Sequence, residues 1–135
     1  MIVRKVLGFI AAVVLASAAG ASFAADQTSA TFSGAVVNAG SVTHTTEAGR
    51  EILRLSADFV VPTKPPAPTW RVVDTQGNIY TLDALRVKAG NGEKREVVLP
   101  AYIHDVAKVQ FYCAFVEVVL GEAAFSPAVA LGPKM

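Results

Sequence analysis

The stretch Val109-Gln110-Phe111-Tyr112-Cys113-Ala114-Phe115 decides the predicted fold, because apolar side chains recur in it at every second position. Successive side chains of a β-strand point to opposite faces of its sheet. One face therefore carries Val109, Phe111, Cys113 and Phe115, and the other carries Lys108, Gln110 and Tyr112. The lysine marks the second face as solvent-facing. The sequence thus predicts a long strand over 106–119, ended by Gly121, that directs Cys113 into a core.

Short strand patterns separated by turn residues continue along the rest of the chain. Ser41 to Thr46 is rich in β-branched residues, and the alternation from Leu53 onward favours a sheet with one buried face. Gly49 lies in the loop between them, where a glycine is free to take a positive φ. Further strands are expected at 30–37, 52–59, 70–74, 79–82 and 96–99, with a short helical turn at 83–85. No long, capped amphipathic helix is recognisable. The chain is therefore predicted to be all-β, a single antiparallel β-sandwich.

Four prolines interrupt these strand patterns in the segment 61–68, at Pro62, Pro65, Pro66 and Pro68. Proline lacks the backbone N–H that a sheet ladder requires, so the segment cannot be a central strand. It is predicted to be a semi-rigid surface connection with polyproline character between two strands. The alternative is a role as a signalling ligand for a partner that binds proline-rich segments.

The N-terminal residues have the pattern of a secretory signal peptide. Arg4 and Lys5 form a short basic region, and an uncharged apolar run follows from Val6. Ser22-Phe23-Ala24 then supplies small residues at the −3 and −1 positions of a cleavage site. Residues 1–24 are therefore assigned to a signal peptide and residues 25–135 to one exported domain, periplasmic or secreted, of a bacterial protein. The alternative is a retained N-terminal anchor, since the uncharged run has about the length of a membrane span, about 20 residues.

The exported domain is close to electrically neutral. Loss of Arg4 and Lys5 with the signal reduces the 12 basic residues to 10, against 11 acidic residues. Such a balance gives no electrostatic reason to bind nucleic acid or an anionic lipid surface. No second stretch approaches the length of a membrane span. Nucleic acid and a membrane are therefore not expected as partners. The expected partner is an envelope protein, or a redox protein if Cys113 acts in redox chemistry.

Cys113 is the only cysteine in the chain. Exported domains meet an oxidising compartment, and one cysteine cannot form an internal disulfide. Three roles are open: a buried structural thiol, a link to a second molecule in a disulfide-bonded dimer, or a redox group. The alternation favours the first role, because free cysteine packs as a small hydrophobe. A reactive thiol needs a positive charge or a metal nearby to lower its pKa, and Lys108 is predicted on the opposite face.

His44 and His104 are the other residues able to hold a metal or a haem near Cys113. A strand histidine and a loop histidine with structural roles are the simpler interpretation. The sequence has no Cys-x-x-Cys, Cys-x-x-Cys-His or Gly-x-Ser-x-Gly motif, no regular zinc-ligand spacing and no phosphate loop. No metal site is predicted, and the lack of a catalytic constellation favours a protein that is not a stand-alone enzyme. Trp70, after the proline segment, is expected to be a core or edge aromatic residue.

The C-terminal half has an apolar strand with one cysteine and an aromatic residue two positions later, and it resembles the DM-thirteen domain family. The resemblance covers roughly residues 31–125 and rests on the segments 40–42, 49–59, 70–72, 82–90, 98–100, 109–115 and 121–125. It implies an electron-transfer domain in which Cys113 acts in redox chemistry. The cysteine would act either as a bare thiol or by holding a group such as haem.

Two functions are therefore expected from the sequence. The first is an exported redox or electron-transfer domain centred on Cys113. The alternative is a non-enzymatic envelope or extracellular protein-binding module in which Cys113 is a structural core thiol. In that case a sheet face or the proline segment would meet the partner. The exposure and reactivity of the thiol distinguish the two.

Overall fold

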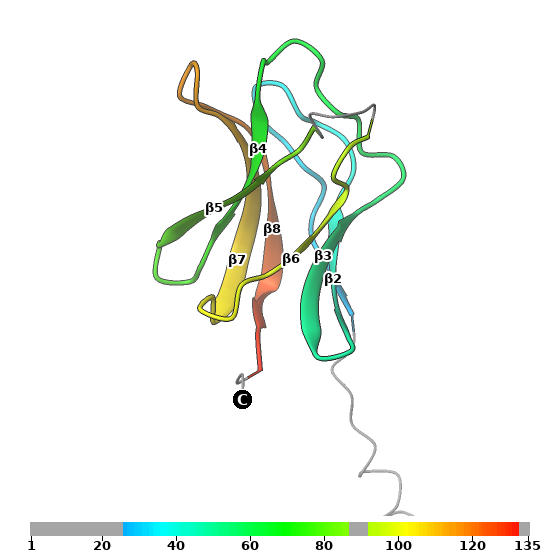
Figure 1. The fold of residues 1–135 in the computed structure, drawn as a ribbon, viewed down its shortest axis with the longest axis vertical. Coiled ribbons are helices and arrows are strands. Elements are labelled where there is room, and N and C mark those ends of the chain that lie inside the picture. Colours follow the sequence, from blue (N-terminus) through cyan, green and yellow to red (C-terminus); the bar gives the residue numbers. More distant parts are fainter. Residues whose placement is uncertain (1–25, 87–91, 133–135) are drawn as a thin grey trace, which may run out of the picture.

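The computed structural model describes residues 26–86 and 92–132. Within them the chain forms two four-stranded antiparallel sheets and no helix, which confirms the predicted all-β sandwich. Figure 1 shows the two sheets beside each other, with the green proline connection crossing between them at the upper end. The predicted signal peptide, residues 1–24, lies outside the described residues.

The first sheet is built on a central hairpin with a short strand at each edge. Its strands are β1 (Gln27–Thr28), β2 (Val42–Glu47), β3 (Arg50–Leu55) and β6 (Glu96–Val98), in the order β1-β2-β3-β6. The register pairs Val42 of β2 with Leu55 of β3, and both side chains are buried. Gly49 in the loop between them has a φ of 78°, so the predicted hairpin with its left-handed glycine is confirmed.

The second sheet contains the strand that carries Cys113. Its strands are β4 (Pro68–Val73), β5 (Ile79–Ala84), β7 (Asp105–Cys113) and β8 (Val118–Ala130), in the order β5-β4-β7-β8. Cys113 lies opposite Pro68 on β4 and Val118 on β8. Val109, Phe111 and Cys113 have no exposed surface, which confirms the predicted inward face of this strand. Pro68 is the first residue of β4, a position that tolerates the missing N–H of proline.

The predicted single strand over 106–119 is wrong, because β7 and β8 divide this region between them. A turn at 114–117 reverses the chain, with Glu117 at a φ of 54°. The reversal turns Phe115 out to solvent, where it is 74% exposed, and not onto the inward face as predicted. Apolar residues continue through Val116, and the turn has no glycine or proline, so the local pattern does not indicate the reversal.

Gly121 does not end a strand, because β8 continues through it. A Cβ at Gly121 would lie 2.6 Å from the Cβ of Val37, so the glycine allows a close approach of two segments. The second of these segments, 30–37, is not the predicted strand but an irregular run along the edge of β8. The amide groups of Val36 and Val37 both donate to the carbonyl of Leu120 at 2.9 Å. This run leaves the first sheet after β1, lies against β8 of the second sheet and returns to the first sheet at β2.

Two other predicted elements have different ends. The strand expected over 52–59 stops at Leu55, and Phe59 enters the core from the loop that follows. The helical turn expected at 83–85 is wrong, because β5 continues through Ala84. In both places the cross-strand partner decides the end, and a local pattern does not include that partner.

Four aromatic side chains from four separate parts of the chain form the centre of the core. The ring centroid of Phe111 lies 4.9 Å from Trp70, 5.1 Å from Phe59 and 5.5 Å from Phe32. Trp70 is fully buried, and its Nε1 donates to the carbonyl of Lys94 at 2.8 Å, so its polar end is satisfied. The prediction of a core or edge role for Trp70 is confirmed as a core role.

Candidate functional site

Cys113 is the last residue of β7 and has no solvent-exposed surface. It is a free cysteine and belongs to the hydrophobic cluster between the two sheets. A thiol in this position can reach a second protein or an oxidant only after local opening of the end of the sheet. The geometry therefore favours the structural thiol over the disulfide-linked dimer.

The environment of the Cys113 sulfur acts on its acidity in two opposite directions. Burial raises the pKa of the Cys113 thiol, while the backbone N–H groups of Ala67, Val116 and Phe115 lower it. The net pKa lies below the ordinary value of a cysteine. Two of the three N–H groups belong to the turn after β7, so the reversal of the chain at this point creates the effect.

In the native protein, we expect Cys113 to react with a water-soluble maleimide at least about 100-fold more slowly than the same thiol in unfolded protein, because labelling needs local opening. Time-resolved labelling with and without denaturant measures the two rates. The control is Thr63→Cys in a Cys113→Ala background, which places one thiol on an exposed position of the proline connection. Native labelling of Cys113 as fast as that control would contradict the burial of the thiol.

Neither histidine shares a metal site with Cys113. His104 precedes β7 and Cys113 ends it, so the whole strand separates them, roughly 30 Å at about 3.3 Å per residue. His44 lies in β2 of the other sheet, opposite Leu53. Over residues 26–86 and 92–132, no group of three or more His, Cys, Asp or Glu side chains could hold a metal ion.

His44 instead forms a buried pair with Glu51. Its Nε2 lies 2.7 Å from Oε1 of Glu51, and the hydroxyl of Thr46 donates to the same oxygen at 2.9 Å. The side chains of His44 and Glu51 are 5% and 10% exposed. Nδ1 of His44 is buried and has no hydrogen-bond partner in the described part of the chain. The pair joins β2 to β3, and loss of either side chain would remove a buried hydrogen bond between the two strands.

The residues at Cys113 do not fit the haem that the family resemblance implies. Core side chains enclose the sulfur, and the two histidines lie elsewhere in the fold. The described pocket at this end of the sandwich is lined by neither a cysteine nor a histidine. An axial ligand pair for haem iron is therefore not assembled by the described residues.

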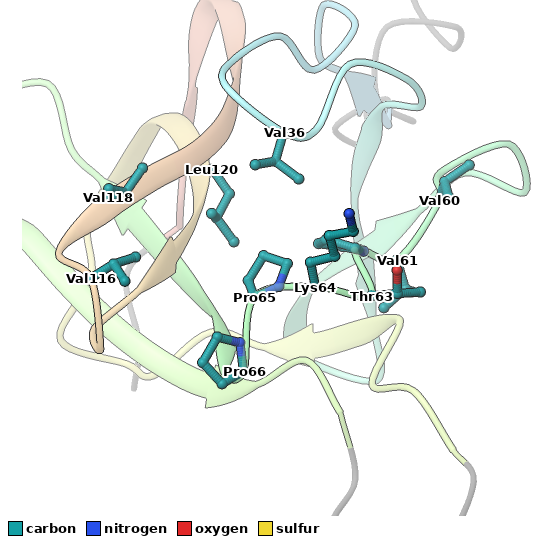
Figure 2. A pocket seen from close by; sticks show the side chains of 11 residues that line it. Val36, Val60, Val61, Thr63, Lys64, Pro65, Pro66, Val116, Val118 and Leu120 are labelled. Atoms are coloured by element: carbon teal, nitrogen blue, oxygen red, sulfur yellow. The ribbon is translucent and has the colours of Figure 1, made fainter.

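An apolar pocket of about 610 Å³ lies where the proline connection crosses between the sheets. We call it the proline pocket, and its lining residues are Val36, Val60, Val61, Pro62, Thr63, Lys64, Pro65, Pro66, Val116, Val118 and Leu120. Figure 2 shows Val116, Val118 and Leu120 on one side, the proline connection with Pro65 on the other, and Val36 closing a third side.

Several valines of the lining are exposed to solvent, although valine is usually a buried residue. Val36, Val60 and Val116 are 46%, 67% and 59% exposed, while Leu120 at the base is almost fully buried. Singly scattered exposed hydrophobic residues are normal, but a contiguous set marks a site of interaction. A volume of this size also lies within the range of small-molecule sites, about 300–1,000 Å³. The proline pocket is therefore the candidate functional site.

Arg86, which follows β5, holds the proline connection in place. Its Nη1 donates to the carbonyl of Pro65 at 3.1 Å, and its Nη2 donates to the carbonyl of Pro62. Two carbonyl groups of the connection are thus already occupied, and its prolines have no N–H to offer. Arg86 therefore restrains this wall of the pocket, and the prolines interrupt its row of backbone donors.

Only one part of this site is predictable from the sequence. The segment 61–68 was predicted to be a semi-rigid surface connection, and residues 61–67 form one outside the strands. The valines of the β7–β8 turn were missed, because they continue the apolar pattern that predicted one long strand. Val36 was also missed, since it was placed in a strand. The prolines, which cannot donate hydrogen bonds, were the one local signal of an apolar wall.

No family model, no curated protein and no solved structure matches this chain. Within the described residues, no helix has the length and apolar character of a membrane span. The inference of a function therefore depends on the geometry and chemistry of the site itself.

Proposed function

We propose that the chain is an exported, non-enzymatic binding module that takes an apolar group into the proline pocket, with Cys113 as a structural core thiol. The observation that supports this function best is the pocket itself. Exposed valines from three separate segments line one concave surface. Arg86 holds one of these segments, the proline connection, in place. A preformed apolar surface binds a ligand with a smaller loss of conformational entropy, because its loops are already ordered.

The residues that line the pocket favour ligand binding over catalysis. Its only charged lining residue is Lys64 and its only hydroxyl is that of Thr63. Over residues 26–86 and 92–132, neither side chain has a hydrogen bond or ion pair that would make it a nucleophile or a general base. Acid–base and nucleophilic catalysis need at least two side chains that act together, such as a nucleophile and a base. The lining of this pocket contains no such pair.

The proposal predicts that a neutral apolar dye, Nile red, binds the native protein at one site and that Val116→Asp weakens its binding at least about tenfold, because a carboxylate would be buried against the dye. Fluorescence titration measures the dissociation constant. Ile79→Asp is the matched control, since Ile79 is an equally exposed aliphatic residue, 54% against 59%, on β5 outside the pocket. Thermal melting of both variants verifies that they fold. Equal loss or equal retention of dye binding in the two variants would contradict the proposal.

A redox role of Cys113 is the second candidate function, and one observation favours it. Three backbone N–H groups lower the pKa of the thiol, which raises the thiolate fraction available to an oxidant once the site opens. The DM-thirteen resemblance supports the same role. Fast native labelling of Cys113, or a visible absorption band that Cys113→Ala abolishes, would favour this function over the binding module. A colourless protein whose thiol reacts only after unfolding would favour the binding module.

A further inference from the structure

We propose that the ligand of the proline pocket is a free fatty acid, a single aliphatic chain that ends in a carboxylate. The inference rests on the proposed binding function and names the class of molecule that the site takes. Three features of the pocket carry it: aliphatic walls without an aromatic platform, a connection whose prolines interrupt its row of N–H groups, and one cation without an ion pair among the described residues.

The walls select an aliphatic chain over other apolar groups. Apart from Thr63 and Lys64, every lining residue is a valine, a proline or a leucine. Aromatic side chains, on which bases and sugars stack, are missing from this lining. Phe115 lies in the same turn as Val116 but does not line the pocket. Branched aliphatic and pyrrolidine groups pack well against a flexible chain of methylene groups through dispersion contacts.

The prolines of the connection make it a poor partner for an extended peptide backbone. An extended peptide needs a row of free N–H and C=O groups to pair with. Pro62, Pro65 and Pro66 have no N–H, and Arg86 already occupies the carbonyls of Pro62 and Pro65. On the facing side, the Leu120 carbonyl accepts from Val36 and Val37. A ligand chain therefore gains mainly apolar contacts in this pocket.

Lys64 supplies the attraction for a carboxylate. It is the one charged residue of the lining, and no ion pair to it occurs in the described part of the chain. Figure 2 shows its side chain beside Pro65 and Val61, with the nitrogen on the side of the pocket where Val36 lies. An exposed ammonium can thus pair with a headgroup while the tail lies among the valines. Lys94 and Lys108, by contrast, are paired with Asp83 and Glu122.

The experiment is a calorimetric titration of the purified domain with dodecanoate, below its micelle concentration, and with dodecyltrimethylammonium as a cationic probe of the same tail length. We expect one dodecanoate per chain. Shortening the tail to decanoate removes two methylenes and should weaken binding about fifteenfold, because each methylene contributes about fourfold. Dodecyltrimethylammonium should bind more weakly than dodecanoate. Val116→Asp should weaken both probes, since it changes the site of the tail.

Charge reversal at Lys64 tests the headgroup separately. In Lys64→Glu, we expect the preference for dodecanoate over dodecyltrimethylammonium to fall at least about tenfold, since an exposed attraction becomes a repulsion. Arg50→Glu is the matched control: it reverses one charge in the exposed β2–β3 loop region, at the lower end of the sandwich in Figure 1, and should leave the preference unchanged. An equal change in both variants would mean a net-charge effect and would overturn the assignment of Lys64.

Further outcomes separate this inference from the proposed function. If Nile red binds at the pocket but dodecanoate does not, the fatty-acid ligand is wrong and the binding module stands. If neither binds, both are wrong. If the chain cosediments with phosphatidylglycerol vesicles but does not bind monomeric dodecanoate, the surface recognises a membrane, and the inference of a free fatty acid is overturned.

Discussion

Trp70→Ala is expected to lower the free energy of unfolding by about 3–5 kcal/mol, the usual cost of removing a fully buried large aromatic side chain. Trp70 has no exposed surface and packs edge-to-face on Phe111 at 4.9 Å. Its removal would leave a cavity in the aromatic centre of the core and leave the Lys94 carbonyl without its donor at 2.8 Å. Because small domains have only about 5–15 kcal/mol of stability, this loss is a large part of the total.

Urea unfolding, followed by circular dichroism, measures this loss. Trp70→Phe is the matched control, since it keeps a ring against Phe111 but removes the indole N–H. We expect it to cost less than the alanine variant, about 1–3 kcal/mol, for a lost hydrogen bond and a smaller cavity. A cost below about 1 kcal/mol for Trp70→Ala would show that the core is not centred on this residue.

Gly40→Ala is expected to lower the free energy of unfolding by about 2–4 kcal/mol, because it combines backbone strain with a steric clash. Gly40 has a φ of 86°, a conformation that is unfavourable for a residue with a Cβ. A Cβ there would also lie 2.6 Å from the Cα of Phe59, an atom of the main chain that cannot move aside cheaply. The variant would therefore push Phe59 out of the aromatic cluster.

Gly49→Ala separates the two contributions. Gly49 has a similar φ of 78°, but nothing lies within 4 Å of the position of a Cβ. Only the backbone strain of a positive φ applies at Gly49, so we expect the free energy of unfolding to fall by about 1–2 kcal/mol. Urea titration of both variants gives the difference. Equal losses would mean that the loop carrying Phe59 adapts freely and that the close approach at Gly40 is not important for stability.

The fold class could be predicted from the sequence because it depends on local rules. Period-two alternation around Phe111 placed Val109 and Cys113 inside, and both are fully buried. Turn chemistry located Gly49, and the missing N–H of proline placed 61–67 outside the strands. Each of these features involves residues that are neighbours in the chain, so a short window of sequence contains the whole physical cause.

The reversal between β7 and β8 could not be predicted in this way. Residues 114–117 are Ala-Phe-Val-Glu, with none of the usual turn residues, and the first three continue an apolar run. The strand ends there because Cys113 pairs with Val118 across the turn and with Pro68 on β4. The role of Gly121 also depends on a residue distant in the chain. The close approach of Val37, and not a turn, requires a glycine at this position.

The sequence by itself determined an all-β chain, an inward-facing Cys113 and a proline connection outside the strands, because periodicity and the chemistry of single residues are local. Only the tertiary structure decided where the proline pocket lies and what lines it. Its walls come from Val36, from the connection at 60–66 and from the β7–β8 region at 116–120. Sheet packing, the hydrogen bonds of Val36 to Leu120 and those of Arg86 to the connection bring these distant segments together. Such contacts depend on the whole fold, so no single segment encodes the site.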